Sequence, residues 1–158
     1  MMTLTRKPTQ TICLGMLVFV ISGTWGYRSG LEVINVTFCG KYDKPPTFKA
    51  SPWPFFPAGV HYNLNVTFAS AVDVLEASMQ YEVVYNGKVI FWKRLDSVCH
   101  AFPYLCSLPA GETIVLAASG EVPVIPRFLK NRICKFKIQL FNGEDIMFLC
   151  AEIEGKVW

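Results

Sequence analysis

The stretch Cys99-His-Ala-Phe-Pro-Tyr-Leu-Cys106 opens the part of the chain that decides the fold, and Cys150 ends it. A proline-broken apolar segment, Val122-Pro-Val-Ile-Pro126, follows the two cysteines. After it, apolar and polar residues alternate over Arg132–Phe141, and a turn at Asn142-Gly143 leads the chain back toward Cys150. Alternation with a period of two is typical of a half-buried β-strand, so this stretch predicts the closing hairpin of a β-domain.

Other short segments upstream alternate in the same way, with turns rich in glycine and proline between them. The clearest is Val60–Phe68, whose even-numbered residues are apolar and whose odd-numbered residues between them are polar. Val72–Ala77 fits a strand, a turn or a helical turn, and the prolines of Ser51-Pro-Trp-Pro-Phe-Phe-Pro57 make it an aromatic loop that cannot join a central ladder. The remaining strand candidates are Leu31–Phe38, Thr47–Ala50, Met79–Tyr85, Lys88–Arg94, Thr113–Ala118 and Ile146–Ile153. About seven or eight strands in 158 residues predict one all-β domain, an immunoglobulin-like two-sheet β-sandwich.

Asn86-Gly87 joins two of these candidates and is the signature of a type I′ hairpin turn. A regular two-residue loop pairs Val83 with Ile90 and Tyr81 with Trp92. We expect these four side chains to cover one face of the sheet.

The first residues have the pattern of a secretory signal peptide, which we place at residues 1–26, so that residues 27–158 form the mature domain. Arg6 and Lys7 precede the apolar run Ile12–Ser22, which is too short to cross a bilayer, and small residues follow it. An uncleaved anchor is the alternative. The signal peptide predicts a protein that is secreted or delivered to the lysosomal lumen.

The charge of the mature domain is nearly balanced. Without Arg6 and Lys7 the 15 basic residues become 13, against 12 acidic residues, which gives a net charge of +1. A nucleic-acid partner requires a basic stripe, so we expect none. Two glycosylation acceptors, Asn35-Val-Thr37 and Asn65-Val-Thr67, agree with export, and Asn65 falls on the polar face of its strand.

Cys13 lies in the signal segment, which leaves five cysteines: Cys39, Cys99, Cys106, Cys134 and Cys150. Five cannot all pair within one chain, so one is free or bonded to another chain. No two have the CxxC spacing, and only His61 and His100 could assist them, so we expect no metal site.

Asp96, Cys99 and His100 lie close together and could form a thiol nucleophile with its base. A disulfide cysteine beside a surface histidine is the simpler interpretation, because a catalytic thiolate needs an unpaired cysteine in an electropositive cleft. We therefore expect neither an enzyme nor a cofactor.

The order of these features, over about Leu31–Ile153, resembles the ML (lipid-recognition) family. The features are Cys39, the Pro-rich turn before Val60, the Cys99–Cys106 loop, Pro109-Ala-Gly111, the Val122–Pro126 segment and Cys150. The family includes ganglioside activator-like proteins, Niemann-Pick type C sterol carriers, phospholipid transfer proteins and a lipopolysaccharide co-receptor of a Toll-like receptor. Lys135 and Met147–Cys150 are similar to the co-receptor, whereas the Pro-rich turn is similar to the activator and the phospholipid carriers.

The resemblance implies disulfides Cys39–Cys150 and Cys99–Cys106. These two pairs leave Cys134 without a disulfide partner. Cys134 lies on the same face of its strand as Phe136 and Ile138, which predicts a buried free thiol that behaves as a small hydrophobic group. The resemblance also implies an apolar cavity between the sheets that holds acyl chains or a sterol. Each methylene buried there contributes about 0.8 kcal/mol, so no sharp polar site is needed.

The candidate lipid-binding residues come from strands and from apolar loops. On the strands they are Tyr62, Leu64, Val66, Phe68, Tyr81, Val83, Ile90, Trp92, Phe136, Ile138 and Phe148. In the loops they are Trp53, Phe55, Phe56, Phe102 and Phe128. We expect the loop residues to rim the cavity and to touch a membrane surface or a partner. The alternatives are an ordinary core for the strand residues and inward-folded plugs for the loops.

Four basic residues lie near the last of these loops: Arg127, Lys130, Arg132 and Lys135. They could contact a lipid phosphate or an anionic membrane surface, or simply form a solvated face.

The expected function is that of a secreted, disulfide-bonded glycoprotein that binds a glycolipid, phospholipid or sterol and extracts, transfers or presents it. One alternative is an innate-immune co-receptor that binds a lipopolysaccharide-like lipid and docks on a receptor ectodomain. Another is an immunoglobulin-like adhesion module with a dry core, although the sequence lacks the central Cys-Trp-Cys arrangement of such modules.

Overall fold

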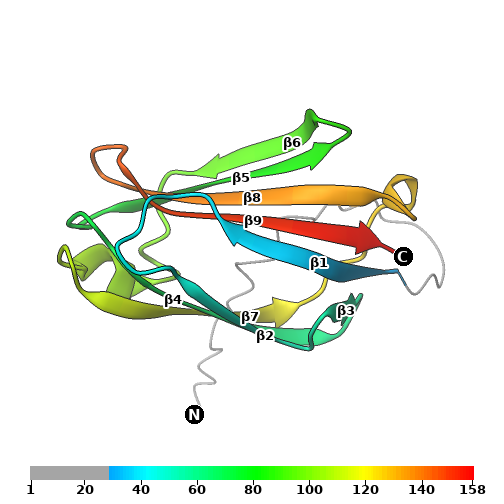
Figure 1. Ribbon diagram of the computed structural model, residues 1–158, viewed down its shortest axis with the longest axis horizontal. Helices are drawn as coiled ribbons and strands as arrows, with labels where there is room; N and C mark the ends of the chain where they lie inside the picture. Colours follow the sequence, from blue (N-terminus) through cyan, green and yellow to red (C-terminus); the bar gives the residue numbers. More distant parts are fainter. Residues whose placement is uncertain (1–28) are drawn as a thin grey trace, which may run out of the picture.

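The structure is a computed structural model that describes residues 29–158. The predicted signal peptide, residues 1–26, and Cys13 lie outside the described residues. Within residues 29–158, nine strands form two sheets that lie one above the other (Figure 1). No helix in this part of the chain is both long and apolar enough to cross a membrane.

The larger sheet has six antiparallel strands in the order β3-β1-β9-β8-β5-β6. Their bounds are β3 Phe55–Pro57, β1 Gly30–Phe38, β9 Met147–Val157, β8 Ile133–Asn142, β5 Ala77–Tyr85 and β6 Lys88–Leu95. The smaller sheet has the order β2-β4-β7, with β2 Thr47–Ser51, β4 His61–Ala69 and β7 Thr113–Glu121. Two short 3-10 helices, η2 Pro103–Ser107 and η3 Arg127–Leu129, lie in the connections. This architecture confirms the predicted all-β two-sheet sandwich.

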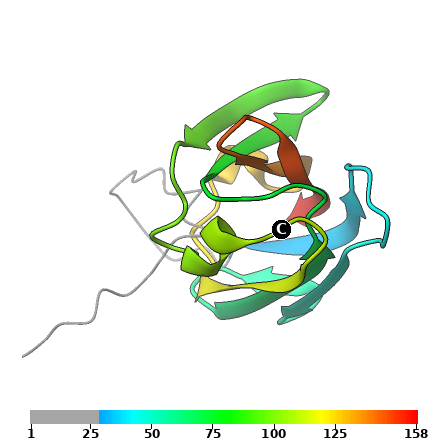
Figure 2. The same cartoon turned by 90° about the vertical axis from the view of Figure 1, so that its left-hand side faces the viewer.

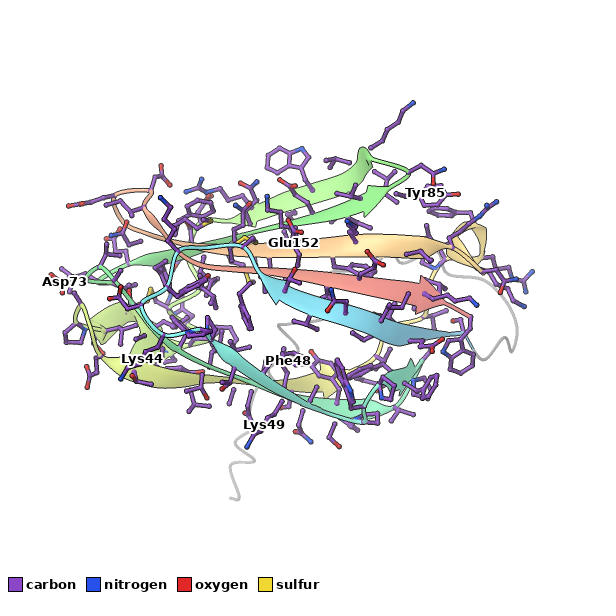
Figure 3. The ribbon with its side chains drawn as sticks, viewed as in Figure 1. Lys44, Phe48, Lys49, Asp73, Tyr85 and Glu152 are labelled. Carbon is purple, nitrogen blue, oxygen red and sulfur yellow. A yellow bond between two sulfur atoms is a disulfide. The ribbon has the colours of Figure 1, made fainter. Side chains whose placement is uncertain are left out.

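The alternation of the sequence decides which face of each strand is buried. On β4, Tyr62 and Phe68 are buried whereas His61 and Asn65 are exposed, as the pattern predicts. Figure 3 shows the same alternation on β2, where Phe48 points between the sheets and Lys49 points away. The inner faces of the two sheets therefore bury much of the apolar surface, and residues of the connections, such as Val74, Leu105 and Leu129, add to the core.

The buried residues form two clusters toward opposite ends of the sandwich. One contains Val66, Phe102, Leu105 and Leu149, and η2 covers it at the end that faces the viewer in Figure 2. The other contains Leu31, Val122, Leu129 and Val157. Leu64 packs against both clusters, so it marks the boundary between them.

The structure adds detail to two local predictions and corrects a third. The aromatic loop contains a short strand, β3, in which Phe56 pairs with Leu31 of β1; it lies at the sheet edge, where proline is tolerated. Asn142 ends β8, and the turn that follows has its positive φ (59°) at Asp145 rather than at glycine. The Asn142 side chain orders this turn by accepting hydrogen bonds from the N–H groups of Glu144 (3.0 Å) and Ile146 (2.9 Å).

The prediction that needs correction concerns the register of the β5–β6 hairpin. Asn86 and Gly87 both have positive φ (50° and 73°), so the type I′ turn is confirmed. A β-bulge between Val83 and Val84 then pairs Val83 with Phe91, not Ile90. The predicted pairs of Val83 with Ile90 and of Tyr81 with Trp92 are wrong. The extra residue in β6 shifts the pairing by one, so each later side chain of β6 lies on the opposite face of the sheet from the one predicted.

The disulfides Cys39–Cys150 and Cys99–Cys106 are both present, as the resemblance implies. The first joins the end of β1 to β9, and the second closes the loop that contains η2. Cys134 is a free cysteine with no exposed surface, which confirms the predicted buried thiol.

Candidate functional site

The space between the sheets contains two apolar cavities, of about 100 Å³ and about 60 Å³. The larger lies toward the end of the sandwich that carries η3, and the smaller lies toward the end that carries η2. Their walls share four residues: Phe48, Leu64, Ile138 and Ile153. The cavities therefore adjoin each other across one layer of side chains.

The size of the cavities limits what they hold without movement. An apolar cavity of about 150 Å³ in another protein takes up a benzene-sized molecule. A lipid chain therefore needs the shared layer to swing aside or the sheets to separate. Loop Ser51–Phe55 ties the two sheets together along the β2–β3 edge, whereas β5 and β6 rise away from the smaller sheet in Figure 1.

Nine of the sixteen predicted lipid-binding residues line these cavities. In the wall of the larger are Phe56, Tyr62, Leu64, Tyr81, Val83, Phe136 and Ile138. In the wall of the smaller, besides Leu64 and Ile138, are Val66 and Phe102. The alternation of side chains along each strand thus brings most of the predicted inner-face residues together.

Phe68 and Phe148 are buried but line neither cavity; their rings stack on each other at 6.1 Å, within the dry core beside η2. Ile90 and Trp92 are 43% and 62% exposed, and they lie outside the cavities because of the hairpin bulge. Placing Ile90 and Trp92 on the inner wall was therefore wrong.

The apolar loops send some residues inward and others outward. Trp53 and Phe55 are half exposed, although the Trp53 ring contacts Phe56 and Phe48 edge to face. Phe128 is 72% exposed, whereas its neighbour Leu129 is buried. Each loop therefore combines a plug with an outward-facing apolar side chain, so neither the rim nor the plug interpretation describes it fully.

The sequence analysis did not include several wall residues. From β1, β2 and β9 they are Leu31, Val33, Phe48, Ala50 and Ile153, and from the segment after β7 they are Val122, Pro123 and Ile125. The same alternation could have identified Phe48 and Ala50, which stand between Thr47, Lys49 and Ser51. Nothing periodic marks Val122 and Ile125, because prolines interrupt their segment.

The basic residues near η3 are exposed, and they have interaction partners on the molecule itself. The Lys135 ammonium lies 3.7 Å from a Glu154 carboxylate oxygen across the β8–β9 pair. The Arg132 guanidinium lies over the Tyr85 ring at 5.8 Å. The outer face of the larger sheet also places Glu82 and Glu152 on either side of Lys137, so it is a charged, solvated surface (Glu152 in Figure 3).

The chemistry of the cavity walls is almost entirely that of hydrocarbon. Burial raises the pKa of the Tyr81 phenol in the wall, and also that of the Cys134 thiol in the adjacent core, so both groups stay protonated at neutral pH. Within residues 29–158, no group of three or more His, Cys, Asp or Glu side chains is arranged to hold a metal ion. The arrangement favours the uptake of apolar molecules.

No protein-family model matches this sequence, and neither does any curated protein in a sequence search. Among solved structures, chicken MD-1 complexed with lipid IVa is similar over 77% of this chain and 96% of its own, with 16% identity and a TM-score of 0.51. A Niemann-Pick type C2 protein from the Japanese carpenter ant is similar over 61% of this chain and 74% of its own, with 13% identity and a TM-score of 0.50. The chain therefore has the β-sandwich fold of MD-1 and of the Niemann-Pick type C2 protein, which is the fold that its resemblance to the ML family implies.

Proposed function

We propose that this protein binds a lipid with its hydrocarbon between the two sheets and extracts, transfers or presents that lipid. The observation that carries the proposal is the pair of adjoining apolar cavities, which share the wall residues Phe48, Leu64, Ile138 and Ile153. An adhesion module with a dry core would be expected to fill this space, because the side chains around an empty cavity lose dispersion contacts. The solved structure of MD-1 with lipid IVa has the same fold and supports this function.

The energetics of hydrocarbon burial favour binding once the sheets separate. About 0.8 kcal/mol for each buried methylene gives a sixteen-carbon chain about 12 kcal/mol, from which ordering and association costs are subtracted. Widening is easiest at the β5–β6 side, since the loop between β2 of the smaller sheet and β3 of the larger sheet connects the two sheets along the other side. The lipid is a glycolipid, a phospholipid or a sterol.

The compartment is part of the proposal. Two disulfides within the described residues suit an oxidising environment, and the predicted signal peptide would direct the chain there. Asn35 and Asn65 are both exposed, on the outer faces of the larger and the smaller sheet, where an oligosaccharide meets no steric obstacle from the core. We propose a secreted or lysosomal glycoprotein.

A co-receptor role is the second candidate, and exposed apolar side chains favour it. Val124 and Phe128 are 73% and 72% exposed and stand on the segment that leads to β8. Exposed apolar side chains close together are common at protein contact surfaces. In this role the lipid-loaded protein docks on a receptor ectodomain, and the exposed segment contributes to the contact.

Native mass spectrometry of the protein secreted by cultured eukaryotic cells tests the main proposal. We expect lipid adducts that organic extraction removes and identifies. The variant Ala50→Phe, which fills the larger cavity, should lose the adducts, whereas Ala117→Phe on the exposed face of β7 should keep them. A clean apoprotein mass for the wild type, or adducts that survive Ala50→Phe unchanged, would contradict lipid binding between the sheets.

A further inference from the structure

The wall of the larger cavity holds one polar side-chain group that makes no hydrogen bond within the described residues, the hydroxyl of Tyr81. Tyr81 is only 6% exposed and lines the cavity from the inner face of β5. Its ring packs against Phe91, with the ring centroids 5.8 Å apart. Burial alone accounts for the raised pKa of its phenol, since no hydrogen bond opposes it.

The other polar residues of this wall differ from Tyr81. Glu82 and Lys137 border the cavity through their backbones, because their side chains stand on the outer face, where Glu82 accepts a hydrogen bond from Gln80 (2.9 Å). The Tyr62 hydroxyl lies against β7, where a Cβ at Gly120 would stand 2.9 Å from it. Tyr81 is therefore the wall residue whose donor remains available to a ligand.

The Tyr81 hydroxyl is not among the fully enclosed unpaired side-chain atoms, which are Ser29 Oγ and Trp158 Nε1, so it keeps some accessible surface. A ligand oxygen that accepts its proton gains a hydrogen bond within an apolar wall. The position of Tyr81 also fixes which end of the ligand meets it. Lys93 pairs with Tyr81 across β5 and β6, lies on the same face of the sheet and is exposed, so water reaches this edge. At the far side of the cavity, Leu31 and Phe56 offer only carbon.

We propose that the Tyr81 hydroxyl donates a hydrogen bond to an oxygen atom of the bound lipid, so that the cavity selects lipids with an oxygen at the β5–β6 edge and hydrocarbon beyond it. This inference rests on the proposed function and deepens it. The shared chemistry is a single uncharged acceptor oxygen next to a long or rigid hydrocarbon. A sterol alcohol and a fatty-acyl ester carbonyl both supply it.

Two pairs of lipids that differ in this oxygen test the inference. Cholesterol is compared with cholest-5-ene, and methyl palmitate with heptadecane, each delivered from cyclodextrin. Binding is measured by displacement of a pyrene-labelled hydrocarbon, which does not need Tyr81. In at least one pair, the wild-type protein should bind the oxygen-bearing member about 3- to 10-fold more tightly, the size of one net hydrogen bond.

The variant Tyr81→Phe should abolish that preference and keep the affinity for the pyrene probe, which also shows that the cavity is intact. Tyr104→Phe is the matched control, because the Tyr104 hydroxyl contacts the backbone of Ala117 on the surface; it should keep the wild-type preference. The pair that shows the preference identifies sterol or ester as the source of the oxygen.

Equal binding of both members of each pair by the wild type would overturn the role of Tyr81 while leaving lipid binding intact. A preference that survives in Tyr81→Phe would overturn it as well. Failure of the pyrene probe to bind the wild type at all would overturn both the inference and the proposed function.

Discussion

The Tyr42 hydroxyl binds both backbone groups of Cys150: it accepts a hydrogen bond from the Cys150 N–H (2.8 Å) and donates to the Cys150 carbonyl (3.3 Å). The same carbonyl accepts a hydrogen bond from the N–H of Cys39, to which Cys150 is disulfide-bonded. One phenol thus completes the hydrogen bonding of β9 beyond the point where β1 ends. Burial raises its pKa, although hydrogen bonds to the backbone of Cys150 and Gly40 oppose that effect.

Removing this hydroxyl should destabilise the protein. Tyr42→Phe leaves the partly buried N–H of Cys150 without a partner, which should lower the free energy of unfolding by about 1–3 kcal/mol. Tyr104→Phe removes a similar pair of contacts, to the Ala117 N–H and carbonyl, but that pair is exposed and longer (3.3 and 3.5 Å). It should change the free energy by less than about 0.5 kcal/mol. Urea denaturation of both variants checks the difference, and equal effects would refute this role of Tyr42.

Cys134 should resist thiol reagents in the folded protein. It has no exposed surface and stands opposite Gly155 in the β8–β9 pair. Because the thiolate is the reactive form and burial disfavours it, reaction with DTNB at pH 8 should proceed only through unfolding. Denaturant should release one reactive thiol from residues 29–158. Rapid labelling of the native protein would show that the space around Cys134 is open.

The same thiol makes stability depend on alkaline pH. Its folded-state pKa lies above the ordinary value of 9.0, so the folded protein holds the proton more tightly than the unfolded chain. Its contribution is fully present below about pH 9 and is lost as the pH rises through the folded-state pKa. The free energy of unfolding of the wild type should therefore fall more steeply above pH 9 than that of Cys134→Ala. Parallel curves for the two proteins would argue against this contribution.

A glycine next to Cys134 is required by packing. A Cβ at Gly155 would lie 2.6 Å from Leu31 Cδ1 and 3.3 Å from the carbonyl oxygen of Glu32. Gly155→Ala should therefore cost about 1–3 kcal/mol through overpacking. Gly143→Ala, in the turn after β8, meets nothing closer than 3.4 Å and is the control, with an expected change within about 0.5 kcal/mol. Thermal unfolding compares the two, and a harmless Gly155→Ala would mean that Leu31 can move away freely.

Alternation was enough to predict the sandwich and much of its inner surface. On β4 and β8, hydrophobic residues occupy every second position, so Tyr62, Leu64, Cys134 and Phe136 could be placed from the sequence. The turn residues between the alternating segments predicted the positions of the hairpins. These features are local, which is why a single sequence contains them.

The features that the sequence analysis missed are tertiary. Phe68 and Phe148 point to the inner faces of their strands, as the cavity residues do. They nevertheless lie in the dry core beside η2, where their rings stack on each other. Whether two inner faces touch or leave space depends on how the sheets diverge, and no residue pattern reports that divergence. Val122 and Ile125 enter the wall because the chain between β7 and η3 packs into the same buried cluster as Leu129 of η3. A β-bulge likewise depends on the pairing of two strands, and it moved Ile90 and Trp92 to the surface.

The bulge provides a direct mutational test of the β5–β6 register. Phe91 pairs with Val83, and its ring lies 5.8 Å from that of Tyr81, whereas Trp92 pairs with Glu82 on the outer face and is 62% exposed. Phe91→Ala should therefore lower the free energy of unfolding by about 1–3 kcal/mol, less than for a fully buried phenylalanine because Phe91 is only partly buried. Trp92→Ala should change it by less than about 0.5 kcal/mol and leave lipid binding intact. In the regular register, without the bulge, Trp92 and not Phe91 would face the cavity, so the two variants would exchange their effects.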